Sequence, residues 1–224
     1  MSENPYKRNP YPEYRKRYFM KGKFITFEGC EGVGKSTQLR LIKEYMQATG
    51  QEAIFTREPG GTPLAEKIRN IILTEEMCAE TEAELFAAAR CDHIDNLILP
   101  ALREGKTVIC DRYVDSSLAY QGFGRNLGYE RVKDINFYAF ENCMPDAVVF
   151  IDMNPLESWR RKKGTVIEND RMEKERDSFH VKVYEGFKTI EGKNGNYLSV
   201  IPETDKVATS SKIIEGLKQR GLIK

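Results

Sequence analysis

The chain has 224 residues, enough for one α/β domain with a sizeable hydrophobic core. Its 35 lysines and arginines almost balance 34 aspartates and glutamates, and a net charge of +1 argues against a broad nucleic-acid or membrane-binding surface. No apolar run approaches the roughly 18 residues of a membrane span. The cysteines are scattered and odd in number, with no C-x-x-C pair, which predicts reduced cytoplasmic thiols rather than disulfides or a zinc site. They are Cys30, Cys78, Cys91, Cys110 and Cys143.

The first twenty residues, MSENPYKRNPYPEYRKRYFM, differ in composition from the rest of the chain. They lack the apolar segment of a signal peptide, and their glutamates and three prolines argue against a mitochondrial transit helix. We expect a poorly ordered tail over 1–20, with Met20 as a second candidate start, and one folded domain over 21–224. Tyrosines among the basic residues leave RNA contact as a minor alternative; nucleic acid is not an expected partner.

Beyond the tail, short apolar runs alternate with longer segments of helical periodicity, the pattern of a parallel sheet wrapped by helices. This predicts a three-layer α/β fold with a five-stranded parallel sheet. The expected strands are 24–28, 53–56, 107–111, 147–152 and 197–201. The expected helices are 36–48, 63–73, 80–104 with a kink or end at Pro100, 129–142, 155–162, 173–191 and 206–220.

The stretch FEGCEGVGKST follows the first expected strand and opens the first expected helix. Its pattern Gly29-x-x-x-x-Gly34-Lys35-Ser36 is that of a phosphate-binding loop, whose backbone N–H groups surround an anion at a helix N-terminus. The lysine would reach the β and γ phosphates of a nucleoside triphosphate, and the serine hydroxyl would ligate Mg²⁺. The residues expected to bind the nucleoside triphosphate are Gly29, Cys30, Glu31, Gly32, Val33, Gly34, Lys35, Ser36 and Thr37. Cys30 is the thiol we expect to be most reactive.

The third expected strand ends in Asp111-Arg112-Tyr113. A carboxylate at this place, next to a phosphate loop, is positioned to hold the Mg²⁺ shell, so Ser36 and Asp111 form the predicted metal site. Arg112 cannot act as a general base, but it can bridge transferring phosphates. The pair therefore favours phosphoryl transfer to a second substrate over hydrolysis.

A nucleotide acceptor requires arginines for its phosphate and an aromatic ring for its base. In LFAAAR, Phe86 and Arg90 are four residues apart on one helical face. Arg57 follows the second expected strand in TREPGGT, and Arg69 lies on the helix after it. Both arginines are candidates for the same cleft.

Taken together, FEGCEGVGKST, TREPGGTPLAEKIR, LFAAAR, VICDRYVDSSLAYQG, MPDAVVFIDMNP and DRMEKE resemble bacterial-type thymidylate kinases of the P-loop nucleoside monophosphate kinase family. The resemblance runs from about Lys21 to the C-terminus. It implies an enzyme that moves the γ-phosphate of ATP to dTMP, giving dTDP and ADP, with Mg²⁺ as cofactor. It also implies a homodimer, to which the helix bearing Phe86 would contribute. His93 and His180 would have structural or surface roles.

The resemblance also assigns roles within the acceptor site. Phe86 would stack on thymine, Arg90 would bond its 4-oxo edge, and Ser117 and Gln121 would contact the base. Tyr120 would crowd the 2′ position of the sugar and so favour deoxyribose. The acceptor phosphate would be held by Arg57, Arg69 and Arg112.

Two positions in the phosphate loop depart from the family pattern. Glu31 stands where the family usually has an aspartate near the acceptor's 3′-hydroxyl, so acceptor preference or rate would change. Val33 replaces a loop arginine of one branch, which moves the catalytic cation to a lid over about 159–172. The sequence there is basic, and Arg161 and Arg171 align with the family's lid arginines, with Lys163 near a third.

Two other functions remain open on sequence grounds. A deoxynucleoside kinase acting on thymidine would use the same loop and lid, with Glu58 as the base near the 5′-hydroxyl. A non-catalytic P-loop nucleotide sensor or scaffold would bind nucleotide without transfer. A GTP switch is disfavoured because the chain has no Asn-Lys-x-Asp element.

Overall fold

The computed structural model describes residues 21–161 and 177–224, with side chains through residue 158 in the first range. In these residues five strands form one parallel sheet, as predicted. Their order in the sheet is β2-β3-β1-β4-β5. The strand ends differ from the predicted ends by no more than one residue. The strands are β1 (Phe24–Glu28), β2 (Ala53–Arg57), β3 (Thr107–Asp111), β4 (Ala147–Ile151) and β5 (Tyr197–Val200).

The centre of the sheet is its most buried part. All five residues of β1 (FITFE) and of β4 (AVVFI) are buried, because helices cover both faces of these strands. The edge strand β2 is only half-buried along most of its length. The continuous apolar runs that predicted the strands therefore belong to the sheet centre.

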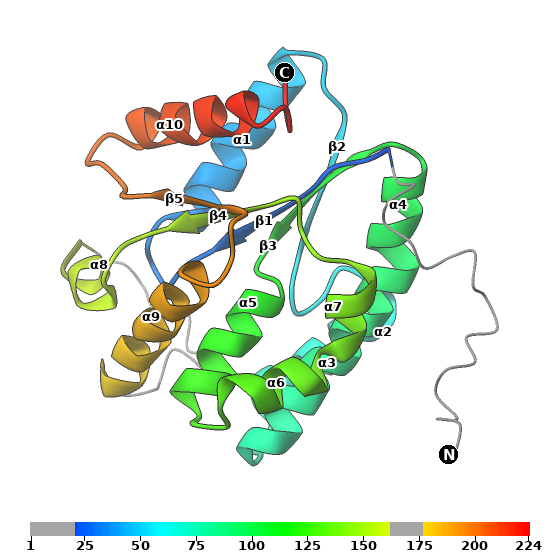
Figure 1. Ribbon diagram of the computed structural model, residues 1–224, viewed down its shortest axis with the longest axis vertical. Helices are drawn as coiled ribbons and strands as arrows, with labels where there is room; N and C mark the ends of the chain where they lie inside the picture. The colour runs from blue at the N-terminus through cyan, green and yellow to red at the C-terminus, as the bar shows by residue number, and fades with distance from the viewer. Residues whose placement is uncertain (1–20, 162–176) are drawn as a thin grey trace.

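The helices form the two outer layers. Figure 1 shows α1 and α10 on one face of the sheet and the larger group from α2 to α7, with α9, on the other. Where they are described, none is long and apolar enough to cross a membrane. Their bounds are α1 (Lys35–Ala48), α2 (Pro63–Thr74), α3 (Ala79–His93), α4 (Leu99–Arg103), α5 (Val114–Ser117), α6 (Tyr129–Ile135), α7 (Phe137–Asn142), α8 (Pro155–Arg161), α9 (Asp177–Glu191) and α10 (Lys206–Gln219).

The described residues include two π-helical segments, one within a predicted helix and one outside the predicted helices. The first, η4 (Ile94–Ile98), joins α3 to α4, so the predicted helix 80–104 neither stops nor breaks at Pro100. Proline cannot donate to the carbonyl four residues earlier and clashes with it, and the wider π turn before Pro100 accommodates this. The second, η5 (Leu118–Gly124), continues α5. The α5–η5 segment was missing from the predicted helices.

Asn136 divides the predicted helix 129–142 into α6 and α7. Its side chain accepts a hydrogen bond from Arg90 and donates one to Val132 O at 2.9 Å, which fixes the break beside the site described below. The tail 1–20 and most of the predicted lid, including Lys163 and Arg171, lie outside the described residues.

Parallel strands bring distant residues to one edge of the sheet. Arg57 of β2 pairs in register with Asp111 of β3, and Asp111 pairs with Phe27 of β1, one residue before the strand ends. The phosphate loop, the Asp111-Arg112 pair and Arg57 therefore meet at the carboxyl edge, where α/β proteins bind ligands.

Candidate active site

The phosphate loop connects β1 to α1. Gly29 has φ 139°, and a Cβ there would lie 2.9 Å from the carbonyl oxygen of Ile151. Gly34 is the N-cap of α1 in the left-handed region, at φ 101°. These positions exclude other side chains by conformation and, at Gly29, by close approach, so the glycines let the chain curl tightly before the helix begins.

Lys35 lies at the base of this loop. It is buried, and its Nζ donates to the carbonyls of Gly29 at 3.0 Å and Cys30 at 2.9 Å. Burial, with the nearby Arg112 guanidinium, lowers the pKa of Lys35, while Glu31 and Asp111 oppose the shift. Lys35 is also the first residue of α1. The positive charge of the lysine and the positive end of the helix dipole both favour an anion at this place.

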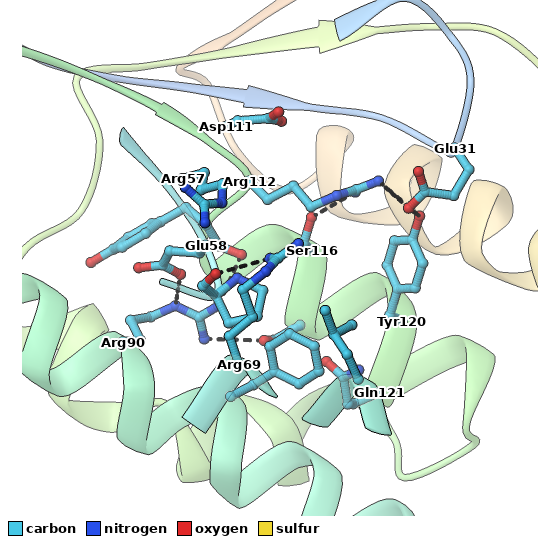
Figure 2. A pocket seen from close by; sticks show the side chains of 15 residues that line it. Glu31, Arg57, Glu58, Arg69, Arg90, Asp111, Arg112, Ser116, Tyr120 and Gln121 are labelled. Carbon is cyan, nitrogen blue, oxygen red and sulfur yellow. Dashed lines mark hydrogen bonds and ion pairs between the residues drawn. The ribbon is translucent and has the colours of Figure 1, made fainter. Parts of the chain in front are cut away.

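A pocket opens beside the loop at the carboxyl edge of the sheet (Figure 2). It brings together all ten residues predicted to bind the acceptor, from five separate segments of the chain. They are Glu31, Arg57, Glu58, Arg69, Phe86, Arg90, Arg112, Ser117, Tyr120 and Gln121. Asp111 lines the same pocket, and so do four residues that sequence reasoning did not assign to it: Pro59, Leu73, Tyr113 and Ser116.

Arg112 links the loop to the pocket. Its backbone has φ 66°, an unusual value for a residue other than glycine. Its guanidinium donates to Glu31 Oε1 at 2.5 Å, to Gly29 O at 3.0 Å and to the Tyr120 hydroxyl at 3.2 Å. The Tyr120 ring also lies 5.0 Å from the guanidinium carbon, and Ser116 Oγ accepts at 3.1 Å. Arg112 is therefore held rigidly between the loop and η5.

The charges of this cluster reinforce one another. Burial raises the pKa of Glu31, but Arg112 and Lys35 outweigh it and bring the pKa to about 2. Burial likewise opposes the charge of Arg112, yet Glu31 and its other neighbours raise the pKa of Arg112 well above its usual range. Both side chains are ionised at neutral pH, so Glu31 is a fixed negative charge at the mouth of the loop.

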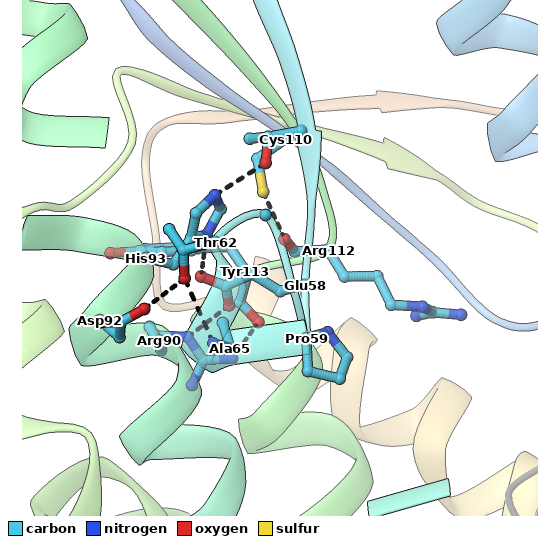
Figure 3. Close-up of polar contacts among 12 residues, drawn as sticks. Glu58, Pro59, Thr62, Ala65, Arg90, Asp92, His93, Cys110, Arg112 and Tyr113 are labelled. Atoms are coloured by element: carbon cyan, nitrogen blue, oxygen red, sulfur yellow. Dashed lines mark hydrogen bonds and ion pairs between the residues drawn. The ribbon is translucent and has the colours of Figure 1, made fainter. Parts of the chain in front are cut away.

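Glu58 supports the opposite side of the pocket (Figure 3). Its carboxylate accepts from Arg90 Nε at 2.7 Å and from His93 Nδ1 at 3.0 Å. The carboxylate can only accept, so Nδ1 is a donor in this hydrogen bond. His93 Nε2 lies 2.8 Å from Thr56 Oγ1. His93 is fully buried, which fits its expected structural role, although we had not predicted its direct contact with a site residue.

Arg90 is buried and held from several sides. Its guanidinium also donates to Ser117 Oγ at 3.1 Å, to Tyr113 O at 3.2 Å and to Asn136 Oδ1. Arg90 and Ser117, expected to face one base, thus contact each other directly. Asn136 was not predicted, because its effect depends on the break between α6 and α7.

The other two arginines lie nearer the pocket entrance. The Arg57 side chain is half exposed and pairs with Glu66 Oε2 at 2.9 Å, and Arg69 donates to Pro59 O at 3.0 Å. Their spacing in the sequence did not settle whether these two arginines face the cleft. In the structure both line the pocket. With Arg90 and Arg112 they give the pocket four guanidinium groups, which suits an anionic ligand.

Glu28, the last residue of β1, is a site residue that we did not predict. It is fully buried and accepts from Tyr113 N at 2.7 Å and from Ser116 Oγ at 2.6 Å. Burial, followed by the nearby Asp115, raises its pKa to about 8. Glu28 therefore fixes the turn that follows Arg112. A carboxyl group at the end of the largely apolar strand FITFE was the only available sequence signal.

Cys30 does not have the expected reactivity. It is buried, and burial raises the pKa of its thiol to about 12. Cys78, at the start of α3, is exposed, and the hydrogen bond between its sulfur and the Thr81 side chain, 3.2 Å apart, lowers its pKa. The prediction that Cys30 is the most reactive thiol is therefore wrong.

The structure describes part of the predicted metal and lid residues. One Asp111 oxygen, Oδ1, is buried and has no hydrogen-bond partner among the described residues. Ser36 is exposed at the start of α1. No cluster of three or more histidine, cysteine or acidic side chains suited to a metal occurs in 21–161 and 177–224. The Arg161 side chain and all of Arg171 lie outside the described residues.

This arrangement can bind two phosphorylated molecules side by side. The loop and Lys35 offer a site for a polyphosphate, and the adjoining pocket combines guanidinium groups with the Phe86 ring and buried polar groups. Positioning and charge are the main requirements of phosphoryl transfer, and both are present.

Comparison with known proteins agrees with this chemistry. A sequence model of the family described as thymidylate kinase matches residues 27–213. A thymidylate kinase of Finegoldia magna is 47% identical over 204 residues, which cover 89% of this chain and 100% of that protein. Thymidylate kinases of Lactobacillus acidophilus and Oceanobacillus iheyensis are 45% and 42% identical, covering 90% and 89% of this chain and 96% and 88% of those proteins. The chain therefore belongs to the thymidylate kinase family, whose members are ATP-dependent nucleoside monophosphate kinases.

Proposed function

We propose that the chain transfers the γ-phosphate of ATP to dTMP, with ATP on the phosphate loop and dTMP in the adjoining pocket. The observation that carries this proposal is the position of Glu31. It belongs to the phosphate loop, it lines the pocket, and it is bonded to Arg112 at 2.5 Å. Donor and acceptor sites thus share a wall, as direct transfer between two substrates requires.

On the donor side, Lys35 binds the β and γ phosphates and the backbone of residues 29–37 surrounds them. Ser36 and Asp111 hold Mg²⁺, which supplies charge compensation for the triphosphate. The donor set fits this ion, because Mg²⁺ prefers oxygen ligands and keeps several waters. The buried Asp111 Oδ1, with no partner in the described part of the chain, supports this assignment.

On the acceptor side, Arg57, Arg69 and Arg112 bind the phosphate of dTMP. Glu31 approaches the 3′-hydroxyl of the sugar. Tyr120 closes the 2′ position and so favours deoxyribose; its hydroxyl lies 3.2 Å from Arg112 and 3.3 Å from Glu31, which holds the ring in place.

The thymine base lies against Phe86. Arg90 donates to its 4-oxo group, and Ser117 and Gln121 complete its polar edge. Arg161 and Arg171 supply positive charge to the transferring phosphoryl group from a lid over about 159–172. These lid roles rest on the sequence and its resemblance to the family.

Glu58 bears on the deoxynucleoside kinase alternative. Both Glu58 oxygens are hydrogen-bonded, one to Arg90 and the other to His93, so the carboxylate already serves as a support for Arg90, a different role from that of a base for a 5′-hydroxyl. The family membership of the chain also disfavours this alternative and the non-catalytic sensor.

The test is ADP release from ATP and Mg²⁺ with dTMP, dUMP, dCMP, AMP, thymidine or no acceptor, measured in parallel. We expect release that depends on dTMP, is weaker with dUMP and is absent with thymidine. The Lys35→Ala variant should abolish it and serves as the control. Release with thymidine but not dTMP would indicate a nucleoside kinase, and release without any acceptor would indicate a hydrolase.

We also propose that the chain pairs with a second copy through the side of the molecule formed by α2 and α3. Leu64 and Ile71, seven residues apart on α2, are 52% and 43% exposed and place apolar surface there. Sedimentation analysis with a Leu64→Glu, Ile71→Glu variant tests this pairing. The free thiols of all five cysteines support a cytoplasmic location.

A further inference from the structure

Behind the base pocket lies an acidic residue of α3, Glu82, that has no role in the site described so far. It is fully buried and does not line the pocket. Its carboxylate accepts a hydrogen bond from Gln121 Nε2 at 2.8 Å. The carboxylate is also paired with Arg125, which lies 3.2 Å from Oε1 through Nε and 3.1 Å from Oε2 through Nη2. Burying a charge in this way is costly unless it is paired, so its position calls for an explanation.

We propose that Glu82 is a positioning residue that fixes the amide of Gln121 and thereby makes the pocket select a base with an N–H group at N3. The inference rests on the proposed function, because it assumes that Gln121 contacts the base.

The orientation of the amide follows from the chemistry of its partner. The two ends of a glutamine amide have nearly the same shape, so a hydrogen-bond partner must decide which end is the nitrogen. An ionised carboxylate can only accept, which requires Gln121 to turn its NH₂ group toward Glu82. Oε1 must then point the other way. Gln121 lines the pocket, and its Oε1 accepts no hydrogen bond from the described protein. Gln121 Oε1 is therefore available to a ligand in the pocket as a hydrogen-bond acceptor.

Arg125 explains why Glu82 remains an acceptor. Its guanidinium faces both carboxylate oxygens and is itself held over the Phe179 ring at 4.7 Å. A neutral glutamic acid could donate to Gln121 and reverse the amide, whereas an ion pair keeps Glu82 charged. Arg125 thus keeps Glu82 charged, and Glu82 in turn fixes the orientation of the Gln121 amide in the pocket.

This polarity distinguishes two classes of pyrimidine. Thymine presents an N–H donor at N3, which the Gln121 oxygen can accept. Cytosine has a lone pair at N3. The Gln121 oxygen could form no hydrogen bond with that atom, and the negative partial charges of the two atoms would repel each other. A buried polar group left unpaired discriminates strongly between otherwise similar ligands. Glu82 therefore contributes to selectivity without touching the base.

The experiment compares the binding of dTMP and 5-methyl-dCMP, which differ only in the 4-substituent and N3. Dissociation constants are measured by calorimetry for the wild type, Glu82→Gln and Gln121→Met. The matched control is Glu80→Gln, which removes a carboxylate of the same helix that is exposed and paired with Arg131 at 3.3 Å. We expect Glu82→Gln to lower the preference for dTMP about tenfold, the effect of one ordinary hydrogen bond. Glu80→Gln should leave this preference unchanged.

A double variant separates the two proposals. If Glu82 acts through Gln121, adding Glu82→Gln to Gln121→Met should change the preference no further. Equal weakening of both ligands by Glu82→Gln would show a merely structural role and overturn the inference. An unchanged preference in Gln121→Met would instead refute the proposed base contact. Should Glu82→Gln fail to fold, Glu82→Asp keeps a charge for Arg125 while withdrawing the acceptor from Gln121, and it should lower the preference in the same way.

Discussion

Replacing Glu58 by glutamine tests whether the Glu58–Arg90 ion pair in the pocket wall stabilises the fold and also positions Arg90, the arginine that we propose binds the base. The Glu58→Gln variant preserves the shape of the side chain but removes its charge. Arg90 would remain buried, with its side chain only 2% exposed, and would lose its counter-charge. His93 Nδ1 would keep an acceptor only if the new amide turned its oxygen toward it, and Arg90 Nε would then face the NH₂ group. One of the two present bonds is therefore lost in either orientation.

The size of the effect follows from burial. Removing one partner of a buried ion pair costs about 3–5 kcal/mol, because the remaining charge is left without compensation. The Glu58 side chain is 3% exposed and its partners Arg90 and His93 are 2% and 0% exposed, so solvent cannot replace the lost interaction. By contrast, the Arg40–Glu44 pair on α1 has side chains 61% and 55% exposed. Glu44→Gln should therefore cost less than about 1 kcal/mol.

Urea denaturation of the two variants and the wild type measures the difference in the free energy of unfolding. The dTMP KM of folded Glu58→Gln should also rise, because Arg90 loses the bond that orients it. A loss of stability below 1 kcal/mol in Glu58→Gln, or one equal to that of Glu44→Gln, would refute the reasoning. An unchanged KM would separate the structural effect from the functional one.

Three further predictions concern charge and thiols. Arg161→Ala should lower kcat about 10²-fold or more with little change in ATP affinity, and steady-state kinetics with nucleotide binding will contradict the lid role if kcat is unchanged. The pKa of Glu31 falls from 4.5 to about 2 on folding, so its interactions stabilise the fold above pH 4.5 and this stabilisation is lost as pH falls toward 2. Glu31→Gln should thus lower the free energy of unfolding by at most about 3 kcal/mol at pH 7, because the side chain is 29% exposed to screening solvent. At pH 3 the loss should be clearly smaller. An equal loss of unfolding free energy at both pH values would refute the lowered pKa of Glu31. A thiol reagent should modify Cys78 of the native protein before Cys30, and mass spectrometry showing the reverse order would contradict the burial argument.

The sequence predicted those parts of the fold that depend on local pattern. Buried parallel strands such as β1 and β4 consist largely of apolar residues. The phosphate-loop pattern also predicts a strand before it and a helix after it. The α5–η5 segment was missed because its residues pack between α3 and α9 and show no simple amphipathic period. The π turns depend on such packing and have no local signal as clear as that of the glycines.

The residues that we propose face the substrate were predictable for a different reason. Phe86, Arg90, Ser117 and Gln121 belong to short motifs whose resemblance to a family gave their roles, and the structure brings all of them into one pocket. The buried residues that hold these side chains in place could not be predicted in the same way. Glu58 meets Arg90 and His93 from 32 and 35 positions away, and a buried pair at such separations leaves no periodic trace in the sequence.

The three supporting residues share one design, because each is a buried carboxyl group that holds a different part of the pocket wall. Glu28 holds Ser116 and the turn after Arg112, Glu58 holds Arg90, and Glu82 holds Gln121. Each group is nearly inaccessible to solvent, so it costs desolvation energy that an apolar residue of similar size would avoid. What the carboxyl groups supply instead is direction, since each fixes the position or the orientation of the hydrogen-bonding group that it holds. A pocket that must recognise one pattern of donors and acceptors needs this direction more than it needs the additional stability of an apolar core.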